Sequence, residues 1–440
     1  MKKTAGWIFI ISLLMPLGLA WAGDTLSLTV NQAVAMSLQN YPSVRQALEQ
    51  AGAAEARVDQ SKSGYYPTVT GEAVYNRLHP IEEVAFGSEV FQMFPADNYD
   101  MHIGLRHNLF DFGKTSTQLN LSRTYQKTSQ DNLQAVKTDL TFQAIKSFYA
   151  VLYLARSVAV EKEEISILQD HLDETGKKVK AGTATDFETL TTQVRVALAQ
   201  NRRIDLENML RKQDIQLTTF LGVANDTRLD LQGDFTVAPV ELDEAKSIDQ
   251  ALQERVEVKL ARDMETAAKV QEKLSKYGNK PTIDLNFSYG VKNGYLPDLN
   301  ERVKNWVAGG DLKIPLIDGL RTHYQEKEAV ANFNAAQARR LEVEKQITTD
   351  VRQAVSDYSS SLEKLSATDL QVKLAQTALD QARIRYDAGV ITNLDLLDAE
   401  NSLSQARLMQ LDAAYSYVLS NYALQKATGV DLSRLPEKSQ

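Results

Sequence analysis

The sequence predicts a mainly α-helical chain whose long helices pack as coiled coils, with four β-strands that complete a small barrel only in a trimer. Two observations predict this fold. One unit of sequence occurs twice, and within each unit segments with the apolar spacing of helices and of strands follow one another in the same order. Three landmarks recur 207 residues later: Leu109-Phe110-Asp111 as Leu316-Ile317-Asp318, Ala181-Gly182 as Ala388-Gly389, and Leu221-Gly222-Val223 as Thr428-Gly429-Val430. Self-similarity at a fixed spacing indicates that one structural unit is present in two copies.

The repeat divides the chain into segments. We expect a first structural repeat at 23–223, a linker at 224–244, a second structural repeat at 245–430 and a C-terminal tail at 431–440. Each repeat has the order helix, strand, strand, long helix, helix. Because the two copies keep one spacing, we interpret them as halves of one fold.

The N-terminus has the features of a secretory signal peptide. Lys2 and Lys3 precede an apolar run that ends at Ala20-Trp21-Ala22, where small residues flank a cleavage point. We expect residues 1–22 to be removed on export; an uncleaved anchor helix is the alternative. The absence of Cys excludes disulfides and thiolate metal sites. A net charge of −8 argues against nucleic acid as a partner.

Six helices follow from the apolar pattern. We expect helices at 31–63, 114–180, 185–220, 247–276, 321–387 and 393–426. The longest would span about 100 Å, and the two shorter helices of each repeat, placed end to end, would match that length. Steps of three and four residues, typical of coiled-coil packing, separate Leu394, Leu397, Asn401, Ser404, Leu408, Leu411, Tyr415, Val418 and Tyr422.

The segments between the first and the long helix of each repeat change to a period of two. In the second repeat Ile283, Leu285, Phe287 and Tyr289 alternate with polar residues, and a partner strand follows near Trp306. Segments of about 10 residues with one apolar face are what a transmembrane β-barrel requires. A water-soluble antiparallel sheet with one buried face has the same pattern, so the strands alone leave both readings open.

The number of strands favours the membrane reading. Four strands cannot close a barrel, and unpaired strand edges are not tolerated in lipid. Together with the export signal and the long helices, this predicts a homotrimer with a twelve-stranded barrel, in which Ile283, Leu285, Phe287 and Tyr289 face lipid. The loops at 79–97 and 293–302 would then lie outside the cell.

These features resemble the outer-membrane factors of the TolC family. The resemblance covers nearly the whole mature chain and includes Leu-Ile-Asp-Gly at 316–319, which opens a long helix. It also includes Tyr386-Asp387-Ala388-Gly389 followed by Leu394-Asp395-Leu396-Leu397-Asp398. The resemblance implies an outer-membrane duct that extends into the periplasm and conducts cargo in tripartite efflux or type I secretion. A periplasmic adaptor (membrane fusion protein) and an inner-membrane transporter would be its partners.

The resemblance also implies two functional regions. Asp395 and Asp398 match the acids that ring the periplasmic entrance in the family, and Glu188 stands at the first-repeat equivalent of Asp395. Tyr386 matches a residue that helps to close this entrance, whereas the family's nearby Arg position holds Ile391. The adaptor would dock at the two helix–helix turns, at Ala181, Gly182, Thr183, Ala388, Gly389 and Val390. Solvated helix acids and plain glycine-capped turns are the simpler readings of these residues.

Other activities lack sequence support. The five His residues show no metal-ligand spacing, and no phosphate-binding loop or hydrolase motif occurs. We therefore expect no catalytic residue, no metal and no cofactor. The remaining alternative is a periplasmic coiled-coil scaffold or adaptor without a pore.

Overall fold

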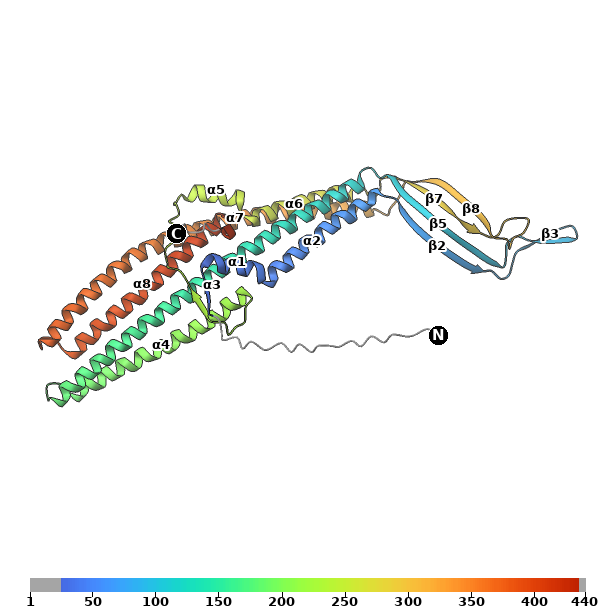
Figure 1. Cartoon of the computed structure of the whole chain (residues 1–440). Coiled ribbons are helices and arrows are strands. Elements are labelled where there is room, and N and C mark those ends of the chain that lie inside the picture. Colours follow the sequence, from blue (N-terminus) through green and yellow to red (C-terminus); the bar gives the residue numbers. More distant parts are fainter. Residues whose placement is uncertain (1–24, 435–440) are drawn as a thin grey trace, which may run out of the picture.

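The computed structural model describes residues 25–434, which form a long bundle of helices with β-strands at one end (Figure 1). The expected signal peptide at 1–22 lies outside the described residues, as do the last six residues of the expected tail at 431–440. No helix among residues 25–434 is long and apolar enough to cross a membrane.

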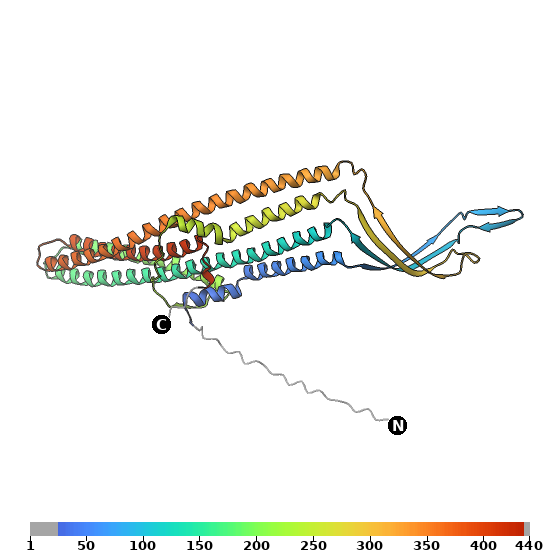
Figure 2. The same cartoon turned by 90° about the horizontal axis from the view of Figure 1, so that it is seen from above.

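Eight α-helices build the rod within the described part of the chain. Their bounds are α1 Val30–Asn40, α2 Pro42–Lys62, α3 Lys114–Lys180, α4 Asp186–Leu221, α5 Glu244–Glu254, α6 Val256–Ser275, α7 Arg321–Asp387 and α8 Asn393–Ala427. The helices α3 and α7 have 67 residues each and run through the whole rod. In the half next to the strands the helices lie side by side in the order α2, α3, α6, α7 (Figure 2). In the other half the order is α4, α3, α8, α7.

Two of the predicted helices are broken, which corrects the ranges 31–63 and 247–276. The first break is at Tyr41, whose backbone is extended (φ −75°, ψ 127°) because Pro42 follows it. The second break is at Arg255 (φ −62°, ψ 132°), where no proline is present. Arg255 instead directs its guanidinium group to Asp350 of α7, with Nη1 3.0 Å from a carboxylate oxygen.

The core lies where these broken helices meet the ends of α4 and α8. One apolar cluster is centred on Phe148 of α3 and includes Leu217 and Leu221 of α4. A second surrounds Tyr358 of α7. The linker adds β6 (Leu229–Leu231), which pairs in parallel with β1 (Leu26–Leu28). The sequence analysis did not predict this two-stranded sheet.

Four antiparallel strands form the main sheet, in the order β2 (Thr68–Arg77), β5 (Asp97–Phe110), β7 (Thr282–Lys292) and β8 (Val303–Lys313). Along the chain β2 follows α2, β5 precedes α3, β7 follows α6 and β8 precedes α7. The order of the strands across the sheet therefore matches the order of the helices, α2, α3, α6, α7. This confirms the predicted mainly helical fold with four strands. The expected loop at 79–97 contains a further hairpin of β3 (Glu83–Phe86) and β4 (Glu89–Gln92).

Candidate functional site at the helix tips

The two helix–helix turns at the far end of the rod have the same geometry. Gly182 (φ 75°) and Gly389 (φ 71°) adopt left-handed backbone conformations that favour glycine. The N–H of Thr183 donates to the carbonyl of Lys178 at 2.9 Å, and the N–H of Val390 donates to that of Arg385 at 2.8 Å. These bonds satisfy carbonyl groups at the ends of α3 and α7. Two matching rigid turns therefore stand side by side.

Glu188 and Asp395 both cap the helix that follows their turn. The Thr392 N–H and hydroxyl donate to a carboxylate oxygen of Asp395 at 2.8 and 2.7 Å, and the Thr185 N–H donates to Glu188 at 3.3 Å. The Thr392 hydroxyl and N–H lower the pKa of Asp395. The pKa is lowered because these cap hydrogen bonds favour the ionised form of Asp395.

Asp398 forms an ion pair that the sequence analysis missed. Its carboxylate lies 2.8 Å from Nη2 of Arg195 on α4, and both side chains are partly exposed. The pair joins α4 to α8. No short-range pattern connects Arg195 with Asp398, because the two residues are far apart in the sequence and meet only through packing.

Tyr386 contacts two side chains of α3. Its ring stacks on His171 with ring centres 5.6 Å apart, and Nζ of Lys178 lies 4.1 Å from the Tyr386 ring centre. Both contacts connect the end of α7 to the end of α3, so Tyr386 joins the two coiled-coil hairpins. Ile391, at the family's Arg position, lies in the same region and lines a cleft between the turns with Tyr386.

A buried hydrogen-bond network continues from this stack. Nε2 of His171 lies 2.6 Å from Oδ1 of Asn393, whose side-chain amide donates to the Thr192 hydroxyl at 3.3 Å. His171 and Asn393 are buried. The network links α3, α4 and α8 and was not predicted, because the sequence marks His171 only as a residue without metal-ligand spacing.

The cleft between the two turns has a volume of about 740 Å³. Phe187 and Leu394 line it from equivalent positions on α4 and α8, and their exposed fractions are 72% and 55%. Val390 of the second turn is 71% exposed. Such a concentration of exposed apolar side chains at the end of a rod is typical of a contact surface.

The strand β7 has the reverse of a soluble protein's surface pattern. Ile283, Leu285, Phe287 and Tyr289 are exposed, whereas the polar residues between them are half-buried. Opposite Leu285 and Phe287 on β8 stand Gly310 and Ala308. On the polar face Asp284 accepts hydrogen bonds at 3.0 Å from Arg106 and from Asn108 of β5.

Comparisons with known proteins agree with this arrangement. The profile of the outer membrane efflux protein family matches residues 33–223 and 247–430. The chain is 23% identical to the outer membrane protein TolC of Vibrio cholerae, covering 96% of this chain and 94% of that protein. It is 22% identical to the alkaline protease secretion protein AprF of Pseudomonas aeruginosa, covering 98% and 89%.

Solved structures share the fold at low sequence identity. The outer-membrane channel OprN superposes with a TM-score of 0.79 at 20% identity, covering 92% of this chain and 90% of that chain. The outer membrane channel CmeC of Campylobacter jejuni gives a TM-score of 0.80 at 16% identity, covering 93% and 87%.

Long helices that continue into an antiparallel sheet thus place the chain in the fold class of outer-membrane channels. The chain belongs to the outer membrane efflux protein family. It is an outer-membrane channel with a periplasmic extension, of the kind that serves tripartite efflux and type I secretion, and it is not an enzyme.

Proposed function

We propose that three copies of this chain form one closed tunnel, in which the strands cross the outer membrane and the helices cross the periplasm. The observation that carries this proposal is the lateral order of the elements. Within the described residues the sheet has two unpaired edges, β2 and β8, and the helical half far from the strands has the two outer helices α4 and α7. A head-to-tail contact repeated by a closed rotation would pair every such edge.

The outer helices support this contact through their exposed apolar side chains. On α4 exposed apolar residues stand three or four residues apart, on one side of the helix, and include Phe187, Leu190, Val194 and Leu198. On α7, Leu370, Leu374 and Ile384 are exposed, with exposed fractions from 58% to 71%. We infer that α4 of one copy packs against α7 of the next.

The tip residues would then form the periplasmic entrance. Three copies place Asp395, Asp398 and Glu188 around one opening, and Tyr386 helps to close it through its contacts with α3. The turns at 181–183 and 388–390 offer exposed contact surfaces for a periplasmic adaptor, which would join the channel to an inner-membrane transporter. Relatives include the cobalt-zinc-cadmium resistance protein CzcC and the protease secretion protein AprF, so the family name alone does not identify the cargo.

Planar-bilayer recording of the Asp395→Ala/Asp398→Ala double variant tests the entrance. A ring of carboxylates concentrates cations at the opening. The double variant should therefore form trimers but lose cation preference and block by trivalent cations. A matched control removes two exposed acids of α7 away from the tips, Glu328→Ala/Glu363→Ala, and should keep both properties. Unchanged selectivity in the tip variant would refute the entrance assignment, and a monomer in detergent would refute the tunnel.

A further inference from the structure

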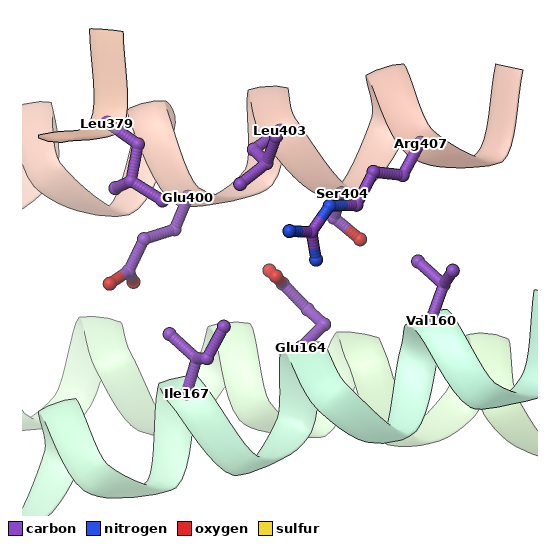
Figure 3. A pocket seen from close by; sticks show the side chains of 8 residues that line it. All are labelled: Val160, Glu164, Ile167, Leu379, Glu400, Leu403, Ser404 and Arg407. Atoms are coloured by element: carbon purple, nitrogen blue, oxygen red, sulfur yellow. The ribbon is translucent and has the colours of Figure 1, made fainter. Parts of the chain in front are cut away.

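A small cavity lies at the α3–α8 seam, the line of contact between the two coiled-coil hairpins of one chain. Glu164 of α3 and Glu400 of α8 line it together with Ser404 and Arg407 (Figure 3). Both carboxylates point into the space between the helices. The cavity has room for about one water molecule, so no bulk solvent hydrates these groups.

Glu400 is buried without adequate polar partners. Its exposed fraction is 3%, and its Oε2 atom makes no hydrogen bond within the described part of the chain. Ser404, with an exposed fraction of 4%, also has a hydroxyl group without a partner there. The nearest cation to Glu400 is Arg383 of α7, at 3.9 Å from Oε1. A buried ionised carboxylate with one distant cation is costly, and a neutral carboxyl group at the same place costs much less.

The other cations around the cavity are already paired. Arg202 of α4 donates from Nε to Glu161 at 3.1 and 3.3 Å, and Arg407 donates from Nη1 to Glu163 at 2.8 Å. Glu164, with an exposed fraction of 5%, has no ion pair within 4.0 Å among residues 25–434. The cavity therefore contains more carboxylates than cations that could neutralise them.

We propose that Glu164 and Glu400 form a proton-binding site, and that a bound proton tightens the contact between the two coiled-coil hairpins. With a proton, a buried carboxyl group carries no charge, so burial in the seam costs it much less. Without protons, two buried negative charges line the same small cavity, and burial and the neighbouring carboxylates destabilise them. Acidic surroundings therefore hold α3 against α8, and alkaline surroundings loosen the seam.

The titration of both groups agrees with this geometry. Burial raises the pKa of Glu164 to about 7, with Glu161 and Glu163 of α3 adding to the rise and Arg202 and Arg407 opposing it. Burial also raises the pKa of Glu400 to about 7, with Glu164 and Glu174 of α3 adding to it and Arg383 opposing it. Because the folded chain holds these protons more tightly than the unfolded chain, stability of the seam falls as pH rises from the ordinary Glu value towards about 7. Above that range it stays constant.

The other repeat carries neutral residues at the matching places. The positions 207 residues away from Glu164 and Glu400 are Gln371 on α7 and Gln193 on α4. In the proposed trimer these two helices form the seam between neighbouring copies. The seam between copies would thus contain glutamine amides where the seam within each copy contains glutamic acids. We therefore expect proton binding to tighten only the seam within a copy.

Hydrogen exchange of the purified full chain at about pH 5 and about pH 9 tests the site, after correction for intrinsic exchange rates. Protection of peptides spanning 160–168 and 400–407 should fall by about tenfold or more at the higher pH. The Glu164→Gln/Glu400→Gln variant should keep its protection at both values. As a control, Asp170→Asn/Asp412→Asn removes two exposed carboxylates of the same helices and should behave like wild type.

Equal pH dependence in wild type and the Gln double variant would overturn the proposal. Should the double variant not fold, infrared difference spectra of wild type between the same pH values provide the decision. A protonated carboxyl band that is lost near neutral pH, and is smaller in Glu400→Gln, supports the site, and the absence of such a band overturns it. Both measurements report on one chain's own seam, so they remain valid even if the channel recordings contradict the proposed entrance.

Discussion

The side-chain contacts of Tyr386 in this structure are made by its ring and not by its hydroxyl group. The ring is held between His171 and Lys178 of α3, and the hydroxyl makes no hydrogen bond with the described residues. A ring over which a Lys ammonium group lies is attracted to that charge, by about 0.5–2 kcal/mol depending on desolvation. Ile391 supplies no charge of its own, and the two hairpins are connected here by the aromatic stack, the network of Asn393 and the Arg195–Asp398 ion pair.

Replacing Asn393 tests whether this network closes the tip. Asn393→Ala leaves Nε2 of the buried His171 without its partner, which costs about 1–3 kcal/mol. The Thr192 hydroxyl still donates to the Glu188 carbonyl at 2.9 Å. We expect single-channel recordings to show a higher conductance, because the hairpins separate more readily. Tyr386→Phe keeps the ring contacts and serves as the control with wild-type conductance. An Asn393→Ala channel that conducts like wild type would show that closure depends on other contacts.

The sequence identified several of these tip residues but not their contacts. Asp395, Asp398 and Tyr386 are expected from the resemblance to the family, and the turn glycines follow from the repeat. Arg195, His171 and Asn393 could not be found in this way, because their roles depend on how α3 and α4 lie against α8. Asp395 caps its own helix through Thr392, three residues earlier, so this contact is local. The partner of Asp398, in contrast, is decided by how α4 packs against α8.

The broken helices are the elements that sequence periodicity described least well. Pro42 signals one break, but the apolar pattern continues across it, and nothing local signals the break at Arg255. In both places a glycine after the last helix of the repeat packs against the break. An added Cβ at Gly222 would lie 2.7 Å from Cβ of Asn40, and one at Gly429 would lie 2.9 Å from Cβ of Glu254. A close approach of the backbone from a distant part of the chain therefore accompanies both breaks, in addition to Pro42 at the first.

A pair of glycine substitutions tests this explanation at the second break. Gly429 has a φ of 84° and no room for a Cβ, so Gly429→Ala should destabilise the chain by about 1–3 kcal/mol. Gly52, in the interior of α2, has no heavy atom within 4 Å of an added Cβ. Gly52→Ala should therefore stabilise α2 by about 0.5–1 kcal/mol. Thermal unfolding in detergent compares the two, and equal midpoints would contradict the role of the close approach.

At the scale of the whole molecule, the same lateral order runs from the strands through the helices. The edge strand β8 is connected to α7, and the edge strand β2 is connected to α2. A rotation that pairs β8 with β2 of the next copy therefore also brings α7 beside the outer helices of that copy. The sequence predicts this architecture from the strand count and the repeat. The extent of the two repeats, 23–223 and 245–430, and the trimer itself remain predictions.

A pair of arginine substitutions in β7 tests which face of the sheet meets lipid. Leu285 is 41% exposed on the apolar face, between Gly310 of β8 and His107 of β5. The adjacent Asn286 lies on the half-buried polar face, where its amide hydrogen-bonds to Asp311. If the apolar face is in contact with lipid, Leu285→Arg places a charge in hydrocarbon and costs about 2–4 kcal/mol near the bilayer midplane. Asn286→Arg places the same charge in a polar, water-accessible interior beside Asp284 and Asp311, and should cost much less.

The measurement is reversible folding into lipid vesicles, followed by the yield of heat-resistant trimer. We expect a lower folding free energy and less trimer for Leu285→Arg, and near wild-type values for Asn286→Arg. The comparison is informative because the two sites are neighbours on one strand, so depth in the membrane, strand pairing and added charge are nearly the same. They differ in the face to which the side chain points. Equal tolerance of arginine at both sites would mean that the apolar face is covered by protein, and the proposed barrel of three copies would then have to be abandoned.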